Sequence, residues 1–203
     1  MHKETQQNKI DALYHTGATT IYSARADNRF AYTLYVPHRL GQMNRAETTI
    51  LVSMHGTGRM LALYRDMFAE FAEYNNCIIL APLFPASVLG DGNMSGYKFL
   101  KEGDIRYDQL VLDMAAEVAE KYGVNDQKLL MFGFSGGGHF THRFTLLHPE
   151  RPQAASIGSP GIVTLAEPTT PWQVGTNGAE AVVGQRVQFA GLKAHPTNMM
   201  GGR

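Results

Sequence analysis

The chain has 203 residues, and its 18 basic and 18 acidic side chains leave no formal net charge at pH 7. This length fits one domain with a substantial core, and the charge balance argues against a nucleic-acid partner or a membrane-surface partner. The single cysteine, Cys77, excludes an internal disulfide framework. Residues 1–8 are polar and no stretch approaches the roughly 20 apolar residues of a membrane span, so we expect a cytoplasmic protein without a signal peptide.

The N-terminal half alternates short apolar runs with polar turns. Residues 1–28 are polar and mixed, which predicts a tail or an edge strand near residues 19–22. Runs of β-branched, aromatic and aliphatic residues then predict three strands, at residues 30–36, 48–54 and 77–83. Between the last two, apolar residues from Met60 to Phe71 recur at helical spacing. Cys77 opens the third strand, where we expect a buried and unreactive thiol.

The middle of the chain contains a long irregular stretch and a helix. Residues 84–103 predict a loop, and loops of about twenty residues inside compact domains are usually functional. The spacing of apolar residues predicts a helix over residues 106–122. Asp104 is a candidate cap for this helix, and Asp108 is expected to be capping or solvated.

The remaining elements complete an alternating pattern. A strand is predicted at residues 128–132, a helix follows it, and a short strand is predicted at residues 153–157. From Ser159 onward proline and glycine break the periodicity, and residues 197–202 begin one more strand. Strands that alternate with helices predict an α/β fold with a mainly parallel, doubly wound sheet and helices on both faces, here over residues 29–203.

A serine stands between two glycines where the predicted strand at 128–132 meets its helix. The sequence G-F-S-G-G places Ser135 between Gly133 and Gly137 in the pattern G-x-S-x-G. Small neighbours allow the sharp strand-to-helix turn that exposes a nucleophilic hydroxyl, and Gly136 follows with a free helix N-terminal amide. No lysine follows, which excludes a P-loop, and Ser135 stands where a dinucleotide-binding loop requires its second glycine.

With these residues in place, the chain resembles the α/β-hydrolases, on the serine esterase side of that family. The resemblance runs from about residue 30 to the C-terminus. It rests on His55-Gly56 after one strand, Ala81-Pro82 in the next, and residues 133–137 at the corner.

The resemblance implies a reaction and the residues that perform it. Ser135 would attack an acyl carbonyl and form an acyl-enzyme, while the backbone N–H groups of Thr57 and Gly136 form the oxyanion hole. His55 would be structural. The implied substrate is a small-molecule carboxylic ester, with thioesters and amides as alternatives, and no cofactor is implied.

The chain departs from the family in its acid and base. The family order is Ser, then Asp or Glu, then His, but no Asp follows Ser135. We expect the acid and the histidine to lie beyond Arg203, with the last strands missing and a sheet edge beside residues 153–157 left open to self-association. Two alternatives stay open: a triad of Ser135, Glu167 and His195, and a non-catalytic scaffold that has kept only the fold.

Two further groups of residues have competing interpretations. His139 and His142 are spaced i, i+3 and could share a metal ion, but without a third ligand we expect a partly exposed helix face and no metal site. Tyr97 and Phe99, in the long loop, would either line an acyl pocket or pack locally.

Overall fold

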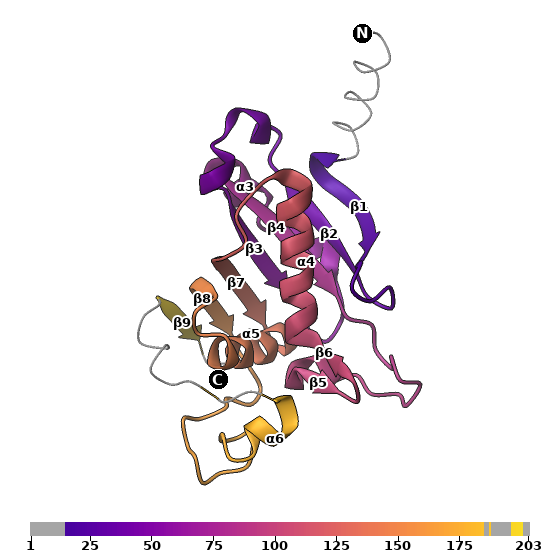
Figure 1. The fold of residues 1–203 in the computed structure, drawn as a ribbon, viewed down its shortest axis with the longest axis vertical. Helices are drawn as coiled ribbons and strands as arrows, with labels where there is room; N and C mark the ends of the chain where they lie inside the picture. Colours follow the sequence, from indigo (N-terminus) through magenta and orange to yellow (C-terminus); the bar gives the residue numbers. More distant parts are fainter. Residues whose placement is uncertain (1–14, 185–186, 188–195, 201–203) are drawn as a thin grey trace.

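The computed structural model describes residues 15–184, 187 and 196–200, and they form one large sheet flanked by helices (Figure 1). The sheet has seven strands in the order β1-β2-β4-β3-β7-β8-β9. Its strands are β1 (Gly17–Ser23), β2 (Ala31–Val36), β3 (Thr49–Met54), β4 (Cys77–Leu83), β7 (Leu129–Phe134), β8 (Pro152–Gly158) and β9 (Thr197–Met200). The helices are α2 (Leu61–Asp66), α3 (Ala69–Tyr74), α4 (Tyr107–Tyr122), α5 (Gly136–Leu147) and α6 (Ala179–Val183).

The sheet is mainly parallel, as predicted. β3 pairs with β4 and β7, β7 pairs with β8, and β8 pairs with β9, all in parallel register. Only β1 and β2, at one side, run antiparallel to their neighbours. The edge strand predicted near residues 19–22 is β1.

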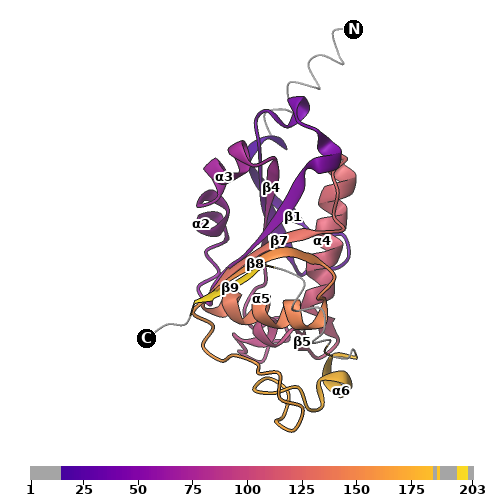
Figure 2. The same ribbon diagram turned by 90° about the vertical axis from the view of Figure 1, so that its left-hand side faces the viewer.

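The central strands β3 and β4 are buried on both faces, which explains their continuous apolar runs. Ile50 and Val52 of β3 belong to the larger core cluster, with residues of α4 and α5, whereas Leu51 between them belongs to a smaller cluster with Ala72 of α3. Successive side chains of a strand point to opposite faces. Figure 2 shows the result, with α2 and α3 on one face and α4 and α5 on the other. Cys77 lies buried in the smaller cluster, as expected, and burial raises the pKa of its thiol to about 12.

The helix expected between residues 60 and 71 is two short helices, α2 and α3, that meet at Met67 and Phe68. Phe68 packs edge-on against Phe132 of β7, with ring centroids 4.8 Å apart. Met60 and Met67 are 57% and 55% exposed, so the apolar spacing does not describe one buried face.

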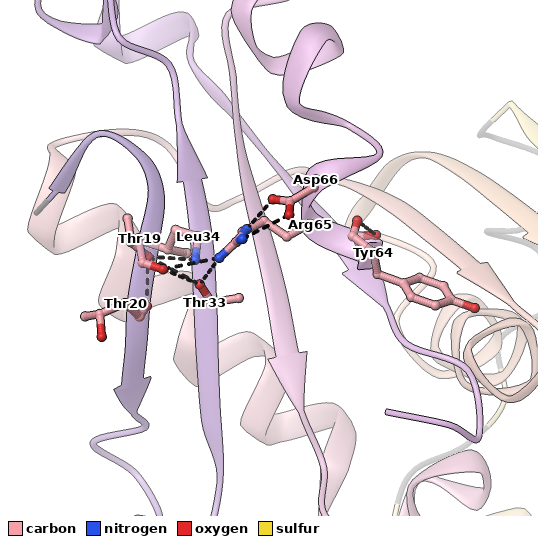
Figure 3. Close-up of polar contacts among 8 residues, drawn as sticks. Thr19, Thr20, Thr33, Leu34, Tyr64, Arg65 and Asp66 are labelled. Atoms are coloured by element: carbon pink, nitrogen blue, oxygen red, sulfur yellow. Dashed lines mark hydrogen bonds and ion pairs between the residues drawn. The ribbon is translucent and has the colours of Figure 1, made fainter. Parts of the chain in front are cut away.

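Arg65 of α2 joins this helix to the antiparallel side of the sheet (Figure 3). The β1–β2 register shifts between Ala18 and Ile21, and Thr19 lies within that bulge. Its Oγ1 accepts a hydrogen bond from the Leu34 N–H at 3.0 Å, while Arg65 donates to the Thr33 hydroxyl at 2.9 Å. Side chains thus replace the backbone pairing that the bulge interrupts.

The long loop is shorter than predicted, because its second half is folded. Residues 96–99 form the 3₁₀ helix η3 (Gly96–Phe99), and β5 (Lys101–Glu102) pairs with β6 (Ile105–Arg106) in a small hairpin. Gly103 takes φ 57 in its turn, a conformation that favours glycine. Strands this short are not visible as hydrophobic periodicity.

Two expectations about acidic residues near α4 are wrong. The helix begins after Arg106 with no side-chain cap, so Asp104 does not cap it. Asp108 is neither capping nor solvated: its side chain is 0% exposed and accepts hydrogen bonds from Arg106 and from His148, which follows α5. The predicted C-terminal end is correct, since Gly123 follows α4 at φ 66.

The sheet does not end at β8. β9 pairs with it in parallel from Ala155–Thr197 to Gly158–Met200, so the edge expected beside residues 153–157 is covered. Within the described residues the edge is β9, whose four residues are all exposed. No helix in the described part of the chain is long and apolar enough to cross a membrane.

Candidate active site

Ser135 stands at a strained corner between β7 and α5. Its φ is 54° and its ψ is −117°, a backbone conformation that a residue with a side chain rarely adopts. The Ser135 N–H donates to the Gly158 carbonyl at 2.9 Å, which ties the corner to the end of β8. Ser135 itself is exposed. The surrounding structure therefore holds the serine in an unfavourable conformation and leaves it open to solvent.

The glycines around Ser135 are required by close backbone packing. A Cβ on Gly133 would lie 2.1 Å from the Gly137 carbonyl oxygen, and a Cβ on Gly137 would lie 2.3 Å from the Met54 carbonyl oxygen. Backbone atoms cannot move aside as a flexible side chain can. The G-x-S-x-G spacing thus follows from the contact between α5 and the ends of β3 and β7.

His55 supports the turn that follows β3. Its Nε2 accepts a hydrogen bond from the Phe84 N–H at 3.1 Å, which leaves Nδ1 to donate to the Gly56 carbonyl at 2.8 Å. Burial lowers the pKa of His55 to about 4, so the ring is neutral near pH 7. Both ring nitrogens serve backbone groups, which matches the structural role that the resemblance implied.

The turn brings Thr57 next to Gly136. A Cβ on Gly136 would lie 3.0 Å from the Thr57 nitrogen and 2.3 Å from the Tyr97 hydroxyl oxygen. The His139 N–H donates to the Ser135 carbonyl at 3.0 Å, so the Gly136 N–H precedes the hydrogen-bonded turns of α5. Two amides from separate segments are thereby adjacent, beside the exposed serine.

Comparison with known proteins gives structural matches only. No family model matches the chain, and no curated protein matches it. Poly(aspartic acid) hydrolase-1 from Sphingomonas sp. KT-1 matches with a TM-score of 0.72 and 22% identity over 91% of this chain and 70% of the other. The poly(3-hydroxybutyrate) depolymerase LpqC from Bordetella parapertussis matches with a TM-score of 0.71 and 24% identity, over 95% and 68%. An S-formylglutathione hydrolase from Agrobacterium tumefaciens matches at 0.57 and 16%, over 78% and 62%.

This chain has the α/β-hydrolase fold. Within this fold, Ser135 stands at the predicted strand-to-helix turn, and Thr57 lies in the turn after β3. At identities of 16–24%, these matches establish the fold alone.

Tyr97 packs at the site instead of lining an open acyl pocket. Its ring is 1% exposed and lies 4.9 Å from the His55 ring, and its hydroxyl contacts the His55 carbonyl oxygen at 3.3 Å. Burial raises the pKa of Tyr97 to about 12. Phe99 is half-buried, with the Arg143 guanidinium 5.1 Å from its ring centroid. Both aromatic residues therefore support the loop locally.

The histidines of α5 serve a different part of the molecule. His139 Nε2 accepts from the Ile162 N–H at 3.1 Å, and burial lowers the pKa of His139 to about 4. His142 is buried, with Nε2 2.8 Å from the Thr164 carbonyl oxygen, so the expectation of a partly exposed face is wrong for this residue. His139 and His142 hold the segment after β8. Among the described histidines, none hydrogen-bonds the Ser135 hydroxyl.

The structure describes two members of the alternative triad, Ser135 and Glu167. Glu167 accepts hydrogen bonds from the Thr169 N–H at 3.0 Å and the Thr169 hydroxyl at 2.7 Å. The hydrogen bond to the Thr169 hydroxyl lowers the pKa of Glu167. Its carboxylate thus stabilises its own turn. His195 lies outside the described residues.

Proposed function

We propose that the chain is a serine hydrolase that cleaves carboxylic esters through an acyl-enzyme on Ser135. The observation that carries this proposal is the conformation of Ser135, at φ 54° and exposed, beside the amides of Thr57 and Gly136. A strained conformation persists only where the surrounding structure enforces it, and such residues cluster at active sites. A simple glycine-rich turn would not need the Thr57 amide next to it.

The proposed chemistry follows from these positions. The Ser135 oxygen attacks the acyl carbonyl carbon, its proton passes to a general base, and the carbonyl oxygen becomes an oxyanion. The Thr57 and Gly136 N–H groups donate to that oxygen, and loss of one such donor typically costs roughly 10²–10³ in rate. The tetrahedral intermediate then expels the alcohol, and water releases the acid from the serine.

The proposed substrate class includes thioesters and amides as alternatives to carboxylic esters. The matched proteins are named for a polyamide, a polyester and a thioester, so thioesters and amides remain alternatives for this chain. A small molecule is the proposed partner, in preference to a nucleic acid or a membrane, because the chain carries no net charge. The cytoplasmic location stays a prediction from composition.

A fluorophosphonate probe tests the proposal directly. The probe phosphonylates an activated serine, so we expect mass spectrometry of the full chain to find the label on Ser135. Ser135→Ala should carry none, whereas Ser156→Ala, which alters a serine of β8, should be labelled like the wild type. Failure of the wild type to label above the Ser135→Ala background would contradict the proposal.

A second candidate function is a non-catalytic scaffold with the same fold. It is favoured by one observation, which is that no described histidine contacts the Ser135 hydroxyl. Removal of a triad member typically leaves only about 10³–10⁴-fold catalysis over water. A chain that unfolds cooperatively but neither labels nor hydrolyses p-nitrophenyl acetate above the Ser135→Ala variant would support this function.

A further inference from the structure

Two cationic side chains lie beside Gly136, a third is buried beneath them, and none of the three has a carboxylate partner among the described residues. They are Arg59, Lys98 and Arg143, from the turn after β3, from η3 and from α5. The ion pairs found in the described part of the chain involve other cations. The like charges of Arg59 and Lys98 repel one another, and this repulsion favours a bound anion.

Arg59 is fixed next to the Thr57 amide. Its guanidinium donates to the Thr57 carbonyl at 2.6 Å, the Phe84 carbonyl at 3.1 Å and the Met94 carbonyl at 2.7 Å. It also lies over the Tyr97 ring, 5.1 Å from the centroid. These acceptors are neutral, so they occupy three of the five N–H donors of Arg59 and leave its charge unbalanced.

Arg143 is fixed beneath Lys98. Its side chain is completely buried, and it donates to the Lys98 carbonyl at 2.7 Å and the Gln173 carbonyl at 3.2 Å. Burial lowers the pKa of Arg143 to about 10, so it remains charged at pH 7. A buried charge without a counter-ion is costly, and such charges mark functional sites more often than exposed ones do.

Lys98 is the cation whose head group remains available. It is half-buried, and its Cε would lie 3.0 Å from a Cβ on Gly136, directly after Ser135. Its ammonium donates to the Ser95 hydroxyl at 3.2 Å, which uses one of three N–H donors. The nearby carboxylate of Glu102 accepts from Tyr107 and Asn93 instead.

We propose that the substrate is an anionic ester, whose acyl part carries a carboxylate that binds Lys98 while Ser135 attacks the ester carbonyl. This inference rests on the proposed function, because it assigns the substrate of the same site. The carboxylate occupies the unused donors of Lys98, and the fixed charges of Arg59 and Arg143 add a favourable field. A neutral ester of the same size gains none of these interactions.

The test measures binding, so it does not depend on turnover. Monomethyl glutarate and methyl 4-carbamoylbutanoate have nearly the same shape and differ in one negative charge. We would titrate each into the 203-residue chain carrying Ser135→Ala and follow the ligand signals by NMR. We expect the anion to bind about fivefold more tightly than the amide, the upper range for a half-exposed ion pair.

Lys98→Met in the Ser135→Ala background should abolish this preference, since methionine keeps the length of the side chain without its charge. Lys128→Met is the matched control, because Lys128 immediately precedes β7, at the opposite end of that strand from Ser135, and should leave the preference unchanged. Equal affinities in the parent protein, or an equal loss for both ligands in Lys98→Met, would overturn the inference.

The two proposals can fail separately. Fluorophosphonate labelling of Ser135 without a charge preference would retain the serine chemistry and refute the anionic substrate. A charge preference lost in Lys98→Met but no labelling would retain the anion site and refute the serine chemistry.

Discussion

At the scale of single residues, the corner at Ser135 depends on positions where no side chain fits. Gly137 shows this most clearly, because a Cβ there would lie 2.3 Å from the Met54 carbonyl oxygen and 2.9 Å from the His55 carbonyl oxygen. Both are backbone atoms of β3 and its turn. The glycine therefore sets the distance between α5 and the turn that carries Thr57.

Gly137→Ala should separate these elements. We expect the free energy of unfolding, measured by urea denaturation, to fall by about 3 kcal/mol, since a small-to-large change in tight packing typically costs 1–3 kcal/mol and backbone neighbours relax least. Gly41→Ala is the control, because a Cβ on Gly41 meets nothing within 4 Å, and it should change stability by less than about 0.5 kcal/mol. Similar values for the two variants would show that the corner tolerates a side chain.

The sequence predicts some residues of the proposed site and misses others for a physical reason. Ser135, Gly136 and Thr57 lie in short contiguous motifs, so their neighbours along the chain reveal them. Lys98 and Arg143 look like ordinary charged residues of a loop and a helix. Their proposed role depends on a contact across 45 positions of the chain, the hydrogen bond from Arg143 to the Lys98 carbonyl. A single sequence does not show which distant segments meet.

At the scale of elements, too, the sequence predicts what depends on neighbouring residues and misses what depends on distant contacts. The long strands and α4 were predicted because each carries its own hydrophobic pattern. The hairpin β5–β6 was missed because two-residue strands have no periodicity, and α2 and α3 were merged because apolar spacing does not reveal a break. β9 was expected as a strand, but its pairing with β8 could not be derived, since register depends on partners.

A buried ionic cluster connects the beginning of α4 to the end of α5. Asp108 accepts from His148 Nε2 at 2.8 Å and from Arg106 at 2.7 and 2.9 Å. Burial alone would raise the pKa of Asp108, but the hydrogen bonds from His148 and Arg106 outweigh it and lower the pKa to about 2 from the ordinary 3.8. The cluster therefore stabilises the folded state in a pH-dependent way.

The direction of this dependence follows from the lowered pKa. The stabilisation is complete above pH 4, where the carboxyl is ionised in both the folded and the unfolded chain, and it is lost as the pH falls from about 4 to about 2. The shift corresponds to about 2 kcal/mol. Asp108→Asn has no carboxyl to titrate. The difference in unfolding free energy between wild type and Asp108→Asn, measured by urea denaturation, should therefore shrink by about 2 kcal/mol as the pH falls from about 4 to about 2.

Asp104→Asn is the matched control for this experiment. The Asp104 side chain is 79% exposed and lies 3.9 Å from Arg29, so its removal should leave both the stability and its pH dependence almost unchanged. A difference between wild type and Asp108→Asn that stays constant from pH 4 to pH 2 would contradict the role given to the buried carboxylate.

At the scale of the whole molecule, the two sides of the sheet differ. At one side the sheet ends in the antiparallel pair β1–β2, with Arg65 bound across its bulge (Figure 3). At the other side β9 has a partner in β8 alone among the described residues. Beside it lies an apolar groove on the α3 face, lined by Phe68, Phe71, Leu130, Phe132, Ala154 and Pro196.

An exposed edge strand next to an apolar groove predicts self-association. The outward-facing backbone groups of residues 198–200 have no strand partner among the described residues and can pair with the same strand of a second copy, and Met199 and Met200, 40% and 57% exposed, would add apolar contact. We expect the sedimentation coefficient of the wild-type chain to rise with concentration in the micromolar range.

A charged residue on the β9 edge should oppose this pairing between copies, so Met199→Lys should weaken the association by about tenfold. Val182→Lys, which replaces a 42% exposed side chain of α6, should have no effect. A wild-type chain that sediments as a monomer at all concentrations, or equal weakening by the two lysines, would show that the β9 edge is not where copies meet.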